Sequence, residues 1–415
     1  MSDEYPVLSH KERDRRWKEV RRLLGSLGMD CVLVFGLKGR EHFECYVANE
    51  HCEGMAILPV ASDPVIVTWH PKMIIRRMGS KTDASRFWIK ESRIGKYGPA
   101  IVEVLKERGL ARGHIGVVGL DVPEAGCPEG IVPYPMWKAV LDGLPEARFT
   151  DISWEFREVM LVKSEEELAV LRRSAKIGER ACEAMLEAVK PGASEFDIYE
   201  AIQSEIHRGG AVSHDPFLIM TWGKDDLGWF EPGWTSYGGA PRRVEPGDLI
   251  MAELFPAYGG LETQQQMSIA VEPVEPMIEE LARVAHRCYE AGIAALKPGN
   301  TFAKLADAML QPVRDIGGWT FTPMLHSVAP LGWTGGMGHN AEAMPEPHRA
   351  FAKTFNAGMG GRHVRALELR ENQSFAFEPN ACKGQRRVNV GGSVVVTKGK
   401  PEELNKLANY MRVVG

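Results

Sequence analysis

Two copies of a Lys-Pro-Gly segment constrain the fold of this 415-residue chain more than any other feature. The copies, Lys190–Gly192 and Lys297–Gly299, lie 107 residues apart. In each copy one helix-type stretch ends and another follows, because proline and glycine do not continue a helix. Two helix ends can match by chance, but strand-type sequence also follows each copy, at Leu249–Val271 and at Ser374–Thr397. The repeat therefore predicts a pseudo-symmetric α+β domain of two similar halves, with a pocket between them.

The first 160 residues have a different pattern, in which helix-type and strand-type stretches alternate. Lys11–Leu27 carries apolar residues at helical spacing, while Gly54–Val60 and Pro64–Trp69 read as the two strands of a hairpin. Alternating helices and strands are typical of an α/β domain. The fold class is therefore a two-domain α/β protein, with the pseudo-symmetric domain second.

The boundary between the two domains falls near residue 160. Phe149–Val162 reads as a connecting strand and linker. Ser164 followed three residues later by Glu167 forms a capping box, which predicts the start of a long amphipathic helix. We therefore expect an N-terminal domain at residues 1–160 and a C-terminal domain at residues 161–415.

The composition is typical of a globular protein and excludes several classes of partner. Apolar residues make up 44% of the chain, charged residues 25%, and the net charge of -5 leaves no basic surplus for nucleic acid or anionic lipid. No apolar run is long enough to span a membrane, and the N-terminus lacks the apolar core of a secretory signal. The seven cysteines form no CxxC pair, which argues against a zinc knuckle or a disulfide framework. We expect a cytoplasmic protein with no nucleic-acid or membrane partner.

Several motifs of the second domain resemble, in order, those of the creatinase, prolidase and aminopeptidase P family (peptidase family M24). They are EPGDLIMAELFPAYGGLETQQQMSIAV, PMLHSVAP, LRENQSFAFEPN and VNVGGSVVVTKGKPEEL. The first 150 residues also resemble the N-terminal domain of that family. The resemblance implies a creatinase-type α/β domain followed by a pita-bread catalytic domain. It also implies a homodimer that acts on a small-molecule substrate.

The resemblance further implies where the metal ligands of the family would fall. They fall on Glu253, Gln264, His326, Glu378 and Gly391. Two metal ions need bridging carboxylates to offset their charge. Because the amide of Gln264 is neutral and Gly391 has no side chain, we expect no dinuclear site and no metal cofactor. A single divalent ion at Glu253, His326 and Glu378 stays open, since one imidazole and two carboxylates can hold one ion.

Glu253, His326 and Glu378 are the predicted catalytic residues. Each lies in apolar strand-type sequence, where an ionisable side chain needs a reason to be buried. The alternatives are an ion pair for Glu253 and a core histidine for His326. Creatinase is the family's precedent for a metal-free site. The stretch that holds the catalytic histidine of creatinase corresponds here to WFEPGWTSYGGAPRRVEPGD, which contains no histidine.

Predicted substrate contacts come from the glutamine run, the segment after residue 48, an aromatic loop and a glycine-rich segment typical of a lid. They are Gln264, Gln266, Glu53, His51, Trp229, Trp234, Tyr237, His339, Arg362 and His363. The glutamines could instead protect a strand edge, and the aromatic residues could pack a loop or a dimer contact.

Three functions remain open at this level. The first is a creatinase-like hydrolase or lyase, which acts at a C–N bond of a small non-peptide molecule by metal-independent acid/base catalysis. The second is an Xaa-Pro dipeptidase or aminopeptidase with a degraded or single-metal site. The third is a non-catalytic module that binds a ligand or peptide. Three ionisable residues in apolar strands favour an enzyme over a binding module.

Overall fold

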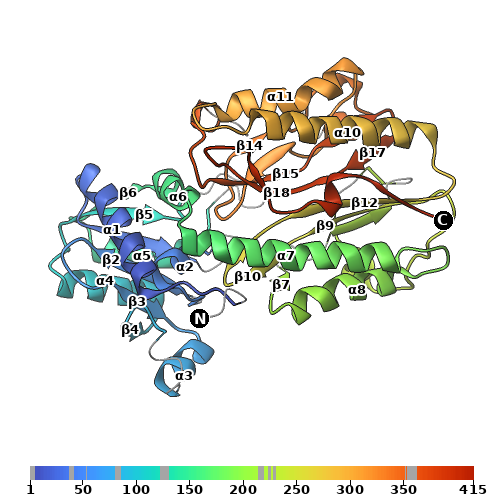
Figure 1. Ribbon diagram of the computed structural model, residues 1–415. Helices are drawn as coiled ribbons and strands as arrows, with labels where there is room; N and C mark the ends of the chain where they lie inside the picture. Colours follow the sequence, from blue (N-terminus) through green and yellow to red (C-terminus); the bar gives the residue numbers. More distant parts are fainter. Residues whose placement is uncertain are drawn as a thin grey trace. The chain divides into compact units, whose positions relative to one another are not determined.

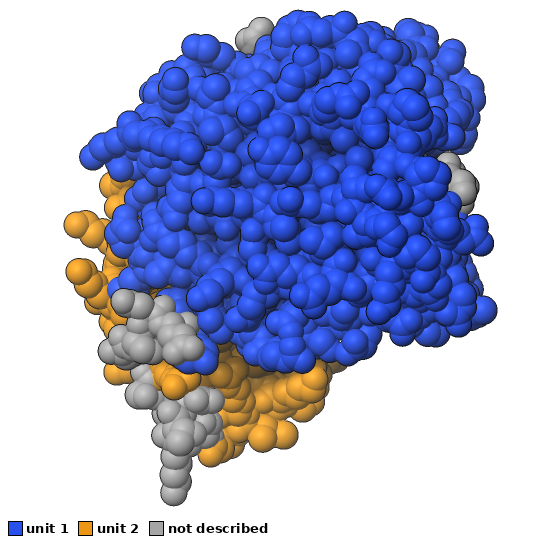
Figure 2. All heavy atoms as spheres, turned by 45° about the vertical axis from the view of Figure 1, so that its right-hand side comes forward, with its two compact units in different colours: residues 1–6, 162–415 blue, residues 7–161 orange. Residues whose placement is uncertain are grey.

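The computed structural model describes residues 5–36, 42–52, 54–79, 86–121, 130–213, 219–222, 226–227, 230–350, 352 and 362–415. The chain divides into two compact units, coloured separately in Figure 2. The N-terminal unit is Val7–Leu161, and the C-terminal unit is Val162–Gly415 together with Met1–Pro6. None of the helices in the described part of the chain combines the length and the apolar character that a membrane span requires.

The N-terminal unit is a six-stranded sheet with helices (Figure 1). The strand order is β4-β3-β2-β1-β5-β6, and its middle strands carry the apolar core. The strands are β1 (Cys31–Phe35), β2 (Gly54–Pro59), β3 (Val65–Thr68), β4 (Glu91–Ile94), β5 (His114–Val118) and β6 (Arg148–Asp151). The helices are α1 (His10–Ser26), α2 (Phe43–Ala48), α3 (Pro71–Gly79), α4 (Tyr97–Glu107), α5 (Tyr134–Gly143) and α6 (Ser153–Leu161). Antiparallel pairing of β2 with β3 confirms the predicted hairpin.

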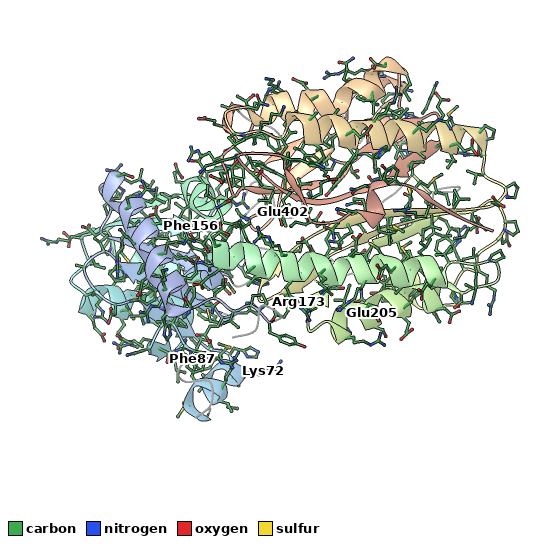
Figure 3. All side chains as sticks on the ribbon, in the orientation of Figure 1. Lys72, Phe87, Phe156, Arg173, Glu205 and Glu402 are labelled. Atoms are coloured by element: carbon green, nitrogen blue, oxygen red, sulfur yellow. The ribbon has the colours of Figure 1, made fainter. Side chains whose placement is uncertain are left out.

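The connection between the units corrects one prediction. The stretch expected to be a strand and linker contains β6 and then a helix, α6. The buried residues of α6 include Ser153, Phe156, Arg157 and Leu161, which is helical spacing. Phe156, labelled in Figure 3, lies edge-on to Phe43 at a centroid distance of 6.4 Å. The aromatic residues of this stretch are typical of strand sequence, but its buried residues have the spacing of a helix packed on a core.

The C-terminal unit contains a long mixed sheet of order β14-β13-β15-β18-β12-β9-β8, with β19 beside β18 and β20 beside β12. Its strands are β8 (Ile219–Trp222), β9 (Leu249–Leu254), β12 (Gln265–Val271), β13 (Leu325–Ser327), β14 (Thr334–Gly335), β15 (Ser374–Phe377), β18 (Gly391–Val395), β19 (Glu402–Glu403) and β20 (Arg412–Val414). Two smaller sheets contain β7 (Val212–Ser213), β10 (Pro256–Tyr258) and β11 (Leu261–Glu262), and β16 (Asn380–Lys383) and β17 (Arg386–Asn389).

Two helix pairs pack on this sheet, α7 (Glu165–Ala188) with α8 (Glu195–Arg208) and α10 (Pro276–Ala295) with α11 (Phe302–Asp315). Short helices α9 (Trp234–Tyr237) and α13 (Arg362–Ala366) lie outside these pairs. The capping box predicted before α7 is present. Arg172 of α7 pairs with Glu402 at 2.8 Å, and Arg180 lies 3.7 Å from Glu205 of α8. Figure 3 labels Glu205 and Glu402.

The predicted repeat is confirmed by matching hydrogen bonds in the two halves. Each Lys-Pro-Gly segment lies between the helices of a pair, and Gly192 and Gly299 have φ values of +86° and +83°. The amide of Gly192 donates to the carbonyl of Val244 at 2.8 Å, and that of Gly299 donates to Leu369 at 2.9 Å. Each half therefore holds its helix pair to the following strand-rich segment in the same way, as the pseudo-symmetric fold requires.

Candidate active site

The sheet of the C-terminal unit brings the three predicted catalytic residues together. Glu253 lies near the end of β9, His326 is the central residue of β13, and Glu378 directly follows β15. All three are buried, with 2%, 6% and 1% of their surface exposed. One side-chain nitrogen or oxygen from each lies within 4.8 Å of those of the other two. Residues more than 50 positions apart in the sequence thus form one polar cluster inside an apolar sheet.

The ring nitrogens of His326 contact three oxygen atoms. Its Nδ1 is 2.8 Å from the carbonyl oxygen of Ser327, which can only accept, so Nδ1 carries a proton. Its Nε2 faces two further oxygens, Oε1 of Glu378 in a close contact and Oε1 of Gln264 at 3.0 Å. A neutral ring would have no proton on Nε2 to donate. A hydrogen bond from Nε2 to Oε1 of Gln264 therefore requires a protonated imidazole beside Glu378.

Gln264 is oriented by its own neighbours. Its Nε2 donates to Oε1 of Glu262 at 2.9 Å, and this contact turns the amide oxygen toward His326. Its backbone amide donates to the Ser393 hydroxyl, also at 2.9 Å. At the position where the family resemblance implies a metal ligand, Gln264 instead accepts a hydrogen bond from the imidazole.

Gln266 and Gly391 show why one carboxylate position of the family is closed. Gln266 lies opposite Glu253 in the pairing of β9 with β12, and opposite Gly391 in the pairing of β12 with β18. The side chain of Gln266 contacts that of Asn389 at 2.6 Å. Gly391 has a φ of +136°, and a Cβ there would lie 2.0 Å from the backbone oxygen of Phe377. The backbone therefore excludes any side chain at residue 391.

A buried guanidinium, that of Arg387 on β17, lies beside this cluster. Arg387 is 1% exposed, and it donates to the carbonyl of Leu227 at 3.1 Å and to the hydroxyl of Thr322 at 2.9 Å. Burial lowers the pKa of Arg387, and the negative charges of Glu253 and Glu378 act in the opposite direction. The positive charge of Arg387 thus compensates two carboxylates that would otherwise be costly to bury.

The residues present do not fit the two-metal site of the family. Gln264 contributes no charge, and Gly391 can carry no ligand. Glu253, His326 and Glu378 offer one ligand atom each, so their donor set fits a single divalent ion.

Three further predicted contacts, Trp234, Tyr237 and His339, have surroundings that the structure describes. Trp234 packs edge-on against Phe196 and Tyr199 of α8, at 4.7 and 5.1 Å, and Tyr237 is 87% exposed. The amide of His339 donates to the hydroxyl of Thr320 at 3.0 Å, and burial lowers the pKa of its imidazole.

Other predicted contacts lie elsewhere in the chain. His51 belongs to the N-terminal unit, where its Nδ1 is 3.0 Å from Oε1 of Glu44. Glu53 and Trp229 lie outside the described residues, and Arg362 and His363 are described only as the first backbone positions of α13. The substrate-binding roles of all these residues stay predictions.

Sequence reasoning missed Arg387 and Glu262. An arginine inside the strand sequence RRVNV was a signal for Arg387, because a buried arginine needs a negative partner. Glu262 carried no such signal, because its role depends on the turn that brings it to Gln264.

Comparisons with known proteins agree with this architecture. The family profile described as metallopeptidase family M24 matches residues 169–398, more than half of the chain. The chain belongs to metallopeptidase family M24. This M24 chain is 22% identical over 406 residues to creatinase from Bacillus sp. (strain B-0618), covering 95% of this chain and 86% of that one. It is 24% identical over 184 residues to Xaa-Pro dipeptidase from Lactobacillus delbrueckii subsp. lactis, covering 44% and 48% of the two chains.

Solved M24 structures share the fold over nearly the whole chain. The X-Pro aminopeptidase from Thermotoga maritima MSB8 superposes with a TM-score of 0.71 at 15% identity, covering 96% of this chain and 99% of that one. The prolidase from Pyrococcus horikoshii OT3 gives a TM-score of 0.68 at 16% identity, covering 94% and 98%. These likenesses confirm the predicted pita-bread fold, and the family profile confirms the predicted family.

Proposed function

We propose that this M24 protein is a creatinase-like hydrolase or lyase that acts at a C–N bond of a small non-peptide substrate without a metal ion. The observation that carries the proposal is the close contact between Nε2 of His326 and the carboxylate of Glu378, next to the fixed acceptor of Gln264. An acid and a base in direct contact and shielded from water are what proton transfer in catalysis requires.

In hydrolysis, a carboxylate takes a proton from water as the water oxygen bonds to the substrate carbon. Glu378 and Glu253 are the candidate bases, since both lie in the cluster. The protonated imidazole of His326 then gives its Nε2 proton to the leaving nitrogen as the C–N bond breaks. In a lyase reaction the same base would remove a C–H proton instead. Both routes start from a protonated His326, whose Nε2 proton leaves with the departing nitrogen.

Two features support a metal-independent route. The carboxylates that would bridge two ions are replaced by Gln264 and by Gly391, and the latter position is sterically closed. Arg387 already supplies a fixed positive charge to Glu253 and Glu378. The similarity to creatinase along 95% of this chain supports a substrate of that general class, such as an amide, amidine or guanidine.

The second candidate is a single-metal peptidase, favoured by the similarity to Xaa-Pro dipeptidase. Glu253, His326 and Glu378 would hold the ion, which would supply Lewis-acid activation of water or of a carbonyl. The ion would add two positive charges beside Arg387, which makes this arrangement less favourable than the metal-free one. A third candidate, a non-catalytic binding module, would keep the cluster but need no proton transfer.

The experiment is a screen of amides, amidines, guanidines and Xaa-Pro dipeptides with the full-length protein, with and without chelator. We expect turnover of a non-peptide substrate that survives chelation. Glu378→Gln should lower kcat by about 100-fold or more, the usual contribution of a positioned acid or base. Glu371→Gln is the matched control, because Glu371 pairs with Lys398 at the surface and should leave kcat unchanged.

Each alternative has a distinct outcome. Cleavage of Xaa-Pro dipeptides that chelator abolishes and Mn²⁺ restores would establish the single-metal peptidase. Ligand binding that is equal in wild type and Glu378→Gln, with no turnover across the screen, would establish the binding module.

A further inference from the structure

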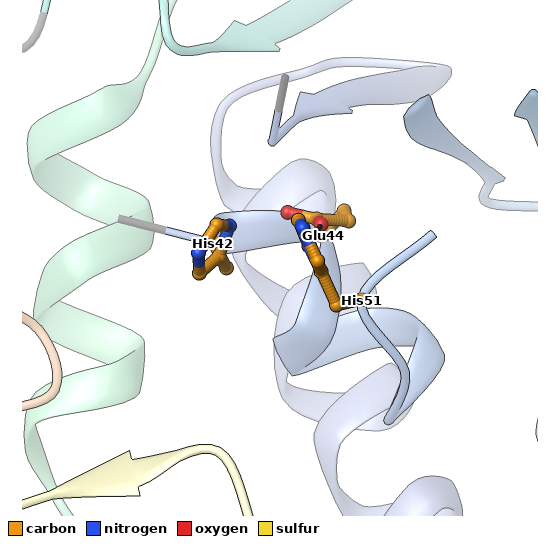
Figure 4. A group of neighbouring side chains, drawn as sticks. All are labelled: His42, Glu44 and His51. Carbon is orange, nitrogen blue, oxygen red and sulfur yellow. Dashed lines mark hydrogen bonds and ion pairs between the residues drawn. The ribbon is translucent and has the colours of Figure 1, made fainter. Parts of the chain in front are cut away.

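A second cluster of metal-binding side chains lies in the N-terminal unit, separate from the site described above. His42, Glu44 and His51 each offer one ligand atom, and these atoms lie within 4.8 Å of one another (Figure 4). The two imidazole rings have centroids 4.1 Å apart and are tilted by 56°. We propose that these three residues form a binding site for a transition-metal ion, with Zn²⁺ as the best match.

The local fold explains how the three side chains meet. His42 is the residue before α2, and its side chain makes no capping hydrogen bond to that helix. Glu44 lies in the first turn of α2. Asn49 ends the helix with a left-handed φ of 54°, which turns the chain back so that His51 faces Glu44. A short helix and one turn thus bring residues from its two ends to the same place.

The carboxylate of Glu44 is the second observation that points to a ligand. Glu44 is fully buried, and its Oε2 has no hydrogen-bond partner among the residues that the structure describes. A Cβ on Gly36 would lie 1.4 Å from that oxygen, so the glycine makes room for the carboxylate. A buried carboxylate with an unsatisfied oxygen is costly, and a bound cation offsets this cost. Its other oxygen, Oε1, lies 3.0 Å from Nδ1 of His51 and 3.9 Å from Sγ of Cys45.

The donor set determines the class of ion. Two imidazoles and one carboxylate suit zinc, nickel or iron(II), whereas Ca²⁺ and Mg²⁺ take oxygen ligands. Three protein ligands leave a tetrahedral ion one open position for water or a further group. His51 is 46% exposed, so an ion can reach the cluster from solvent. The proposed site is therefore a three-ligand site with an open position.

The test uses full-length protein freed of metal by chelator and titrated with Zn²⁺ alone against a competing chromophoric chelator. His326→Asn serves as the background, because it removes the histidine of the other cluster. We expect one equivalent of Zn²⁺ per chain in this background. Adding His51→Gln or Glu44→Gln to this background should weaken Zn²⁺ binding by about 100-fold or more. In the background protein itself, Co²⁺ should give the visible absorption of a four-coordinate ion.

Two further variants separate ligation from general damage. Gly36→Ala should also weaken Zn²⁺ binding, because its methyl group displaces the carboxylate of Glu44 without removing a ligand. His114→Gln is the matched control, since His114 contacts Gly28 and Thr150 in the same unit and should leave the affinity unchanged. His51 is partly exposed, so its variant should fold, as circular dichroism can verify. Unchanged Zn²⁺ affinity in folded His51→Gln and Glu44→Gln, or no Zn²⁺ binding in the background protein, overturns the proposal.

Discussion

Gly391 lies so close to Phe377 that no side chain fits between them. A Cβ on Gly391 would be 2.0 Å from the backbone oxygen of Phe377, and the φ of +136° is one that other residues rarely adopt. The family ligand expected at residue 391 is therefore lost through the path of the backbone as well as through the residue type. This relationship makes the loss of a side-chain ligand at residue 391 a property of the backbone.

Replacing Gly391 with alanine should test this closure directly. The new methyl group would clash with the backbone and force an unfavourable φ, so we expect the free energy of unfolding to fall by about 3 kcal/mol or more. Gly384→Ala is the matched control: its φ is also positive, at +57°, but nothing lies within 4 Å of its Cβ. It should cost only about 1 kcal/mol, from backbone strain. Equal losses in urea unfolding would show that the clash at Gly391 is relieved at no cost.

Restoring one lost carboxylate should not rebuild the dinuclear site. Gln264→Asp returns an acid to the position that the family resemblance assigns to a ligand, but residue 391 stays closed. We expect elemental analysis after dialysis against Mn²⁺ or Co²⁺ to find the same metal content in Gln264→Asp and wild type. A gain of two ions per chain in the variant would mean that other side chains can complete the site.

Removing the buried guanidinium of Arg387 should lower the free energy of unfolding. Arg387→Met keeps most of the volume but removes two buried hydrogen bonds and the positive charge that acts on Glu253 and Glu378. We therefore expect a loss of about 1 to 3 kcal/mol in unfolding free energy. Arg386→Met is the control on the same strand. Arg386 is 30% exposed and pairs with Glu275, and such a pair is worth at most about 1 kcal/mol. Similar losses in the two variants would argue against a compensating role for Arg387.

Much of this architecture could be predicted because short sequence motifs determine where its helices begin and end. The Lys-Pro-Gly segments fixed two helix ends, and the capping box at Ser164 fixed the start of α7. The family resemblance located Glu253, His326 and Glu378, and their place in apolar strand sequence supported their role. The prediction of a strand and linker at Phe149–Val162 was wrong for a local reason as well, since its aromatic residues masked the helical spacing of α6.

The parts that could not be predicted depend on contacts between distant residues. The orientation of Gln264 depends on Glu262 across a turn, and the burial of Arg387 depends on the carbonyl of Leu227, 160 positions away. His51 was predicted as a substrate contact from its position in the chain. Its partner Glu44 was missed, because a left-handed turn at Asn49 brings them together and the sequence only permits such a turn.

The orientation of Gln264 leads to the last prediction. Because its amide accepts from Nε2 of His326 and donates to Glu262, Gln264 is a positioning residue for the imidazole. Gln264→Met should lower kcat by about 10- to 100-fold through misplacement of the ring, with KM little changed. It should also shift the pH profile of kcat, which a purely structural role would leave in place. Gln265→Met is the control: Gln265 donates to Thr263 and Asn405 instead, so its loss should reduce stability and leave both kcat and the pH profile unchanged. If Gln264→Met raises KM at constant kcat, Gln264 contacts the substrate and does not position His326.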